Sequence, residues 1–189
     1  MEFGVFSEFE CRTIGFKFAK DDKHALMDLV GSIEETMDTK TVVKKRQGTT
    51  YKTTTRGTGA GTIKVTAHVP YDIYCKMYAM DIEGLIDGVK AYGYESVHEK
   101  FSVTAEVYDE DNEQKLKAWP KCTMTNGVVR KVENGAEEVA EIELEIAVMP
   151  DEYGNGMYEA ISSTLTDETA KKTWLEEFAP ELVKKTPTV

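Results

Sequence analysis

Cysteine is scarce in this sequence, and the few cysteines present lie far apart. Cys11, Cys75 and Cys122 are isolated and odd in number. They form neither a disulfide framework nor a CxxC metal pattern, so we expect free, buried thiols in a protein assembled in a reducing cytoplasm. Long apolar runs are also missing. None approaches the roughly 20 residues that span a bilayer, and residues 1–6 lack the pattern of a signal peptide, so we expect no membrane anchor.

Positive charge is in short supply. The chain has 23 Lys and Arg residues against 34 Asp and Glu residues, which gives a net charge of −11. A chain this acidic is a poor ligand for the outside of DNA or for an anionic membrane, because both need cations at phosphates. It is still able to surround nucleic acid without binding it. The hydrophobic fraction of 41%, with 7 Phe, 9 Tyr and 2 Trp, indicates a folded protein rather than a disordered acidic one.

Catalytic and metal-binding motifs are missing too. Gly57-Thr-Gly59-Ala-Gly61 lacks the GxGxxG spacing and precedes a strand pattern, so flexibility or close subunit approach is the favoured interpretation. The run Asp109–Glu113 begins like a calcium loop, but Gln114 stands where glycine is required, so we expect a plain hairpin turn. The three histidines lack ligand spacing, and no GxSxG elbow occurs. We therefore predict no enzyme, no catalytic residue, no metal and no cofactor.

One strand pattern is unusually acidic. Ile142, Leu144, Ile146 and Val148 alternate with Glu141, Glu143, Glu145 and Ala147. Side chains of a strand alternate between two faces, so one face is aliphatic and the other carries three consecutive carboxylates. No Lys or Arg lies between Lys131 and Lys171 to neutralise this row. The row is either a sheet edge kept apart by charge or a wall that faces a polyanion without adhering to it.

The segment from Lys40 to Thr62 differs from the rest of the chain. It is rich in threonine and glycine, it has few large apolar residues, and positive charge concentrates in it at Lys44-Lys45-Arg46. Threonine favours extended backbone, and glycine favours bends or close approach. We predict a long polar hairpin or loop that projects from the body over residues 40–62.

The remaining patterns predict a mainly β single domain over residues 1–189. Alternation predicts strands at 62–69 and 101–107, followed by strands at 116–124 and 128–132 and the acidic strand in an antiparallel meander. Pro70 begins a short amphipathic helix over 71–80. Thr166-Asp167-Glu168 caps a terminal helix that Pro180 interrupts.

Two stretches together resemble the major tail proteins of tailed phages and prophages of Gram-positive hosts. One runs from Lys52 through the glycine-rich Gly57–Gly61 to Pro70 and its helix, and the other from Ile142 to Gly156. The similarity covers roughly residues 40–165, about two-thirds of the chain, and its motifs have low specificity. The resemblance implies an antiparallel β-sandwich of the tail-tube fold, with a short flanking helix, a long projecting loop and a C-terminal arm or helix.

The resemblance also implies a function. Such proteins form hexameric rings that stack into a tube around the tape measure protein, and DNA later passes through that tube. The partners would be further copies of the chain, the tape measure protein, the tail terminator and distal tail proteins, and transiting DNA that is not specifically bound. The location would be the virion tail, assembled in the host bacterial cytoplasm.

The same resemblance assigns roles to particular residues. Residues 1–12 would form an N-terminal arm, 40–62 a loop between subunits, and 165–189 a C-terminal arm or helix. The predicted lumen-facing residues are Glu141, Glu143 and Glu145. The predicted contacts between subunits are Lys44, Lys45, Arg46, Tyr51 and Arg56. The main alternative is a soluble β-sandwich module that binds a protein or glycan, and a weaker one is an intracellular enzyme on a β-rich fold.

Overall fold

The computed structural model describes residues 5–28, 30–132, 134–135 and 139–184. Residues 1–4 of the predicted N-terminal arm and residues 185–189 of the predicted C-terminal arm lie outside this range. The strands are β1 (Glu10–Phe18), β2 (Ala25–Met27), β3 (Val30–Arg46), β4 (Thr49–Ala67), β5 (Phe101–Tyr108), β6 (Gln114–Met124), β7 (Ile142–Val148) and β8 (Tyr158–Ile161). The helices are α1 (Tyr71–Met77), α2 (Glu168–Glu177) and the 3-10 turn η1 (Pro180–Val183).

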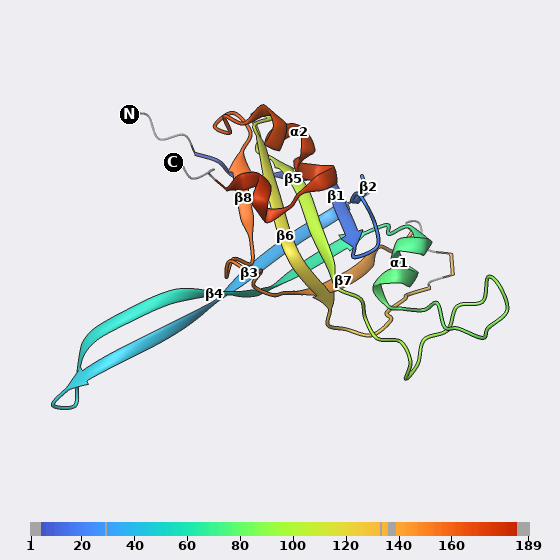
Figure 1. Cartoon of the computed structure of the whole chain (residues 1–189), viewed down its shortest axis with the longest axis horizontal. Helices are drawn as coiled ribbons and strands as arrows, with labels where there is room; N and C mark the ends of the chain where they lie inside the picture. The colour runs from blue at the N-terminus through green and yellow to red at the C-terminus, as the bar shows by residue number, and fades with distance from the viewer. Residues whose placement is uncertain (1–4, 29, 133, 136–138, 185–189) are drawn as a thin grey trace.

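All eight strands belong to one antiparallel sheet, which confirms the predicted mainly β fold. The strand order is β2-β1-β5-β6-β7-β4-β3, with β8 beside the first half of β6. The sheet curves so that its two halves face each other across one core, as in an antiparallel β-sandwich (Figure 1). The halves do not close completely. A hollow of about 460 Å³ separates residues 8–12 from the first residues of β3.

The core between the two halves follows from the period-two patterns. The side chains that alternate inward are almost fully buried: Ile14 and Phe16 of β1, Ile63 and Val65 of β4, Val103 of β5, Trp119 of β6, and Leu144 and Ile146 of β7. Burial of a large apolar side chain contributes roughly 1.5–3 kcal/mol. The three cysteines are free thiols, and Cys75 and Cys122 are buried. Burial also raises the pKa of the Cys11 thiol to about 11.

Helix α1 closes one end of this core. It begins directly after Pro70, as predicted, and buries Tyr74, Cys75 and Met77. The predicted helix is three residues too long at its C-terminal end. Ala79 adopts a left-handed conformation (φ 48°), and the Met80 N–H donates to the Cys75 carbonyl at 3.0 Å. This is the Schellman geometry that ends helices, here with alanine where glycine is usual.

The predicted strand at 128–132 is wrong. Those residues form an irregular connection between β6 and β7, which pair directly through Cys122–Val148 and Met124–Ile146. The opposite edge of β7 pairs with β4 along its whole length. Because β6 and β7 pair with each other directly at residues 122–124 and 146–148, residues 128–132 do not form a strand between them.

The two ends of the described chain lie against the protein's own sheet. Strand β1 begins at Glu10, so residues 10–12 of the predicted N-terminal arm belong to the sheet. Helix α2 begins at the predicted cap, where the Asp167 carboxylate accepts the N–H groups of Thr169 and Ala170. It packs Trp174 and Phe178 on Leu116 and Ala118 of β6, on the face opposite the main core. No helix among the described residues has the length and apolar character needed to cross a membrane.

Candidate assembly surfaces

The most prominent feature of the molecule is an arm made of the outer parts of β3 and β4, residues 38–58. It projects far beyond the body as a twisted two-stranded hairpin (Figure 1). Every residue of the arm is exposed. The prediction of a projecting polar hairpin or loop over residues 40–62 is confirmed for residues 40–58, which form a regular β-hairpin, whereas Gly61 and Thr62 pair with β7 in the body. Gln47 and Gly48, with φ of 50° and 78°, close the hairpin in a tight two-residue turn of the kind that matches strand twist.

The base of the arm explains the Gly57–Gly61 run. Between the pairs Met37–Gly61 and Thr39–Gly57, β3 has one residue and β4 has three, so a bulge bends the arm relative to the sheet. Gly59 has a φ of 76°, and a Cβ placed there would lie 2.5 Å from the carbonyl oxygen of Gly154. Gly59 therefore allows a close approach, but the neighbour is the 150–156 loop of the same chain rather than another subunit.

One face of the arm is cationic. Strand register places Lys40 opposite Arg56 and Lys44 opposite Lys52, and side chains two residues apart in a strand share a face. These four cations therefore line one face, together with Val42. Between the two pairs, the opposite face of the arm carries no charged side chain. On that face the hydroxyls of Thr41 and Thr55 form a hydrogen bond of 2.9 Å.

The cationic face is unfavourable in an isolated chain. Like charges directly opposite each other in an antiparallel pair are destabilising, and the arm has two such pairs. Among the described residues, no carboxylate lies within ion-pair distance of an arm cation. A two-stranded ribbon is itself only marginally stable in water. An anionic partner would remove the repulsion.

In the structure, the residues predicted to contact another subunit lie in different parts of the arm. Lys44 and Arg56 share the cationic face, whereas Lys45 and Arg46 flank the turn at the tip. Tyr51 is 65% exposed at a bulge, where β4 has one residue more than β3. Sequence reasoning missed Lys40 and Lys52. Their positions in the register depend on that bulge, which the sequence does not reveal.

The arm also separates charge across the whole molecule. Six cations and no acids fall within residues 39–58, at Lys40, Lys44, Lys45, Arg46, Lys52 and Arg56. The rest of the chain then has 17 Lys and Arg residues against all 34 Asp and Glu residues. The protein thus consists of a strongly acidic body with a basic projection.

The acidic strand lies in the half of the sheet from which the arm emerges. Leu144, Ile146 and Val148 of β7 point into the core, so Glu143 and Glu145 point away from it. Register places Lys64 of β4 opposite Glu145, and Glu34 of β3 opposite Lys64. The tertiary structure thus supplies one cation that the nearby sequence lacks. We call the outward surface of β7, β4 and β3 the acidic face.

Glu141 lies just before β7 and extends this surface. Its carboxylate occupies the space beside Gly31, the bulged residue between the Val30–Ala67 and Ser32–Thr66 pairs. The three predicted glutamates therefore lie along one margin of the acidic face, and only Glu145 is partly covered. Helix α2 covers the outward surface of the other half of the sheet, on the opposite side of the core.

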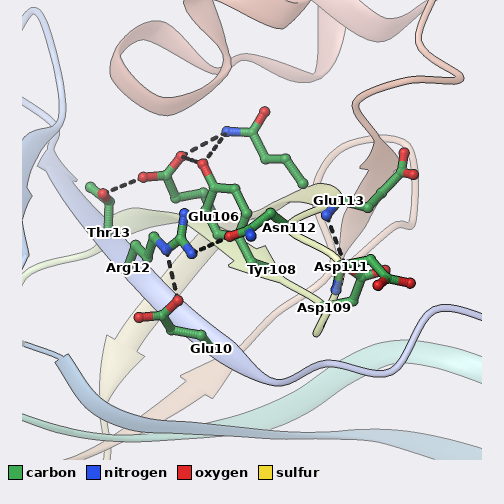
Figure 2. A network of polar contacts seen from close by, with 10 residues as sticks. Glu10, Arg12, Thr13, Glu106, Tyr108, Asp109, Asp111, Asn112 and Glu113 are labelled. Atoms are coloured by element: carbon green, nitrogen blue, oxygen red, sulfur yellow. Dashed lines mark hydrogen bonds and ion pairs between the residues drawn. The ribbon is translucent and has the colours of Figure 1, made fainter.

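The residues between β5 and β6 form a plain hairpin turn, as predicted, and hydrogen bonds within the protein hold it. The Asp109 carboxylate accepts the N–H groups of Asp111 and Glu113 at 2.9 and 2.7 Å. In Figure 2 the Arg12 guanidinium bridges Glu10 and the Asn112 side chain, and it lies 3.9 Å above the Tyr108 ring. The Asp109 carboxylate thus closes the turn through backbone N–H groups, and Arg12 joins β1 to the turn through Asn112.

Lysine ammonium groups of the protein itself form ion pairs with a second group of carboxylates, Glu8, Glu35 and Glu159. Lys117 is 2% exposed, and its Nζ lies 2.7 Å from Glu8 and 2.5 Å from Glu35. Lys115 lies 3.2 Å from Glu8 and 3.7 Å from Glu159. This cluster holds residues 5–9 against β6, and it is an ion-pair network rather than a metal site.

No protein-family model and no curated protein matches this chain. Its function is therefore inferred from the arm, the acidic face and their placement on a β-sandwich. Each of these two surfaces is charged and open to solvent.

Proposed function

We propose that this chain is the repeating subunit of a tail tube, like the major tail proteins of phages and prophages with long non-contractile tails. Copies of the chain join into hexameric rings, and the rings stack into a tube. The tube encloses the tape measure protein during assembly, meets the terminator and distal tail proteins at its ends, and later conducts DNA. Assembly takes place in the host bacterial cytoplasm, and the mature location is the virion tail.

The exposed arm is the observation that carries this proposal. Residues 38–58 form a regular hairpin whose residues are all exposed in the part of the chain that the structure describes, and opposed like charges weaken it. The body of every copy carries excess negative charge. A second copy is therefore an electrostatically complementary partner for the arm. Contact between the arm of one copy and the body of the next would join the copies into a polymer.

The acidic face supports the second half of the proposal. A channel that conducts DNA must not retain it, and carboxylates repel phosphates. Glu143 and Glu145 project from the side of the sandwich that α2 does not cover. In the proposed tube this side forms the wall of the lumen, and α2 lies on the exterior.

Negative-stain electron microscopy of concentrated purified protein tests the proposal. Wild-type protein should form rings or tubes with a stain-filled lumen. Reversal of the cationic face by Lys40→Glu, Lys44→Glu, Lys52→Glu and Arg56→Glu should abolish them. The circular dichroism and melting temperature of the monomer should hardly change, because all four side chains are exposed.

A control places two carboxylates on the other face of the arm, with Thr41→Glu and Thr55→Glu. This variant should still assemble if the cationic face makes the contact. Wild-type protein that stays monomeric at high concentration and at every ionic strength would refute the tube and favour a β-sandwich binding module. Unaltered tubes from the reversed variant would refute the role of the arm.

A further inference from the structure

An ordered loop occupies the end of the molecule opposite the arm. Between α1 and β5 the chain forms neither helix nor strand, and we call residues 81–99 the acidic loop. The Ala91 N–H donates to the Met80 carbonyl at 3.1 Å, and His98 bridges the Tyr92 hydroxyl and the Met124 carbonyl. The tip is therefore fixed at its base and extends away from the body (Figure 1).

The tip of the acidic loop exposes apolar side chains. Leu85 is 42% exposed, Ile86 is 82% exposed and Val89 is 50% exposed. They surround a hollow of about 270 Å³ formed by residues 81–83 and 85–89. Grouped apolar exposure of this kind marks contact surfaces more often than scattered single residues do.

The same tip is negatively charged. Its one lysine, Lys90, forms an ion pair with Asp81. Glu83 and Asp87 remain beside the apolar group, and Glu95 and Glu99 follow along the loop. The surface thus combines aliphatic contacts with carboxylates that no cation of the loop offsets.

The arm has the complementary combination. Its cationic face carries Val42 between Lys40 and Lys44, with Lys52 and Arg56 on the facing strand, and the exposed Tyr51 precedes Lys52 at the bulge. In Figure 1 the arm extends toward one end of the longest axis and the acidic loop toward the other. Two complementary surfaces at opposite ends cannot meet within one molecule, but they meet when copies are arranged head to tail.

We propose that the arm of one copy docks on the acidic loop of the next copy along the polymer. Val42 covers the hollow beside Leu85, Ile86 and Val89, and the arm cations lie against Glu83 and Asp87. This inference rests on the proposed function and specifies its receiving surface. A head-to-tail contact is heterologous, so it extends without limit unless rotation closes it, and such growth lengthens a tube.

The energetics suit a repeated contact. An exposed ion pair contributes little by itself, so charge selects the partner and the apolar contact adds affinity. Each copy gives one arm and receives one, so the contact recurs at every copy of every ring. Weak contacts repeated in this way produce a stable assembly.

A charge-swap series tests the proposal. Glu83→Lys with Asp87→Lys should raise the concentration required for polymerisation by about tenfold or more, and so should Lys44→Glu with Lys52→Glu. The chain that carries all four substitutions restores opposite charges and should polymerise again. The control Glu110→Lys with Asp111→Lys makes the same charge change on the exposed β5–β6 turn, at the far end of β5, and should assemble like wild type.

The outcomes separate the two proposals. If wild type forms tubes and the loop variant does so equally well, the acidic loop is not the receiving surface, and the tube stands. If wild type forms no tubes, the proposed function fails and this inference fails with it. Zero-length carbodiimide cross-linking of wild-type tubes should join Lys44 or Lys52 to Glu83 or Asp87 of another copy. Cross-links from these lysines only to other carboxylates would refute the docking site.

Discussion

At the scale of single residues, buried charge holds the N-terminal stretch in place. Lys117 is almost fully buried, and it bonds Glu8 from residues 5–9 and Glu35 from β3. Burial alone would raise the pKa of Glu8, but hydrogen bonds and charge from Lys117 and then Lys115 bring it below the ordinary value of 4.5. Ionised Glu8 therefore stabilises the folded chain.

This shift predicts a pH dependence for Glu8→Gln. The pKa is lower in the folded state than in the unfolded state, so the stabilisation is complete above pH 4.5 and is lost as pH falls through the folded value. We expect Glu8→Gln to lose about 1 kcal/mol near neutral pH, discounted because Glu8 is partly exposed, and to converge with wild type in acid. Urea titrations from pH 7 to pH 3 measure the difference.

The control for this prediction is Glu110→Gln, which neutralises a carboxylate in an exposed turn and should unfold like wild type near neutral pH. A constant gap between Glu8→Gln and wild type down to acidic pH would show that the carboxylate charge does not supply the stabilisation.

At the scale of elements, one bulge with two close glycine contacts sets the direction of the arm. Gly59 has a left-handed conformation and lies against the backbone of Gly154, and the Cβ position of Gly156 lies against the Gly59 carbonyl. Gly57, two residues along the same strand, has open space around it. The two glycines therefore differ in function although they look equivalent in the sequence.

This difference predicts unequal effects of alanine. Gly59→Ala should destabilise the protein by about 2 kcal/mol or more, because alanine is strained at positive φ and its Cβ would strike a carbonyl oxygen. Gly57→Ala should be neutral or slightly stabilising, because it only restricts the unfolded chain. Thermal unfolding of both variants makes the comparison. Equal losses would mean that contact with the 150–156 loop does not fix the arm.

Element by element, the sequence predictions succeeded where a pattern was regular and local. The strands around Val65, Val103 and Ile146, the helix after Pro70 and the cap at Asp167 follow from periodicity and capping chemistry. The prediction at 128–132 failed because β6 and β7 pair with each other directly, without an intervening strand. The pairing of Lys44 with Lys52 was not predictable, because a bulge shifts the register.

At the scale of the whole molecule, the sandwich separates two chemically different outer surfaces. The acidic face lies over β7, β4 and β3, and α2 covers β5 and β6 on the other side of the core. The cysteines offer little competing reactivity, because Cys75 and Cys122 are buried and burial raises the pKa of Cys11 to about 11. A cysteine introduced on either surface therefore reports which one is accessible after assembly.

The proposed tube predicts opposite labelling of the two surfaces. In assembled tubes, Glu143→Cys should react much more slowly with a polymer-linked maleimide than Lys172→Cys on α2, because the lumen excludes the bulky reagent. In unassembled protein both should react rapidly, since both positions are exposed. Rapid labelling of Glu143→Cys in tubes would place the acidic face outside.

The sequence by itself determined the mainly β class, the alternation that builds the core, the excess of acid and the polar segment that leaves the body. These depend on local backbone preference and on which side chains avoid water. Only the tertiary structure decided which strands share edges, which cations share a face of the arm, and that Lys64 lies opposite Glu145. Such relations join residues far apart in the chain, and bulges and edge competition set them, so no local pattern encodes them.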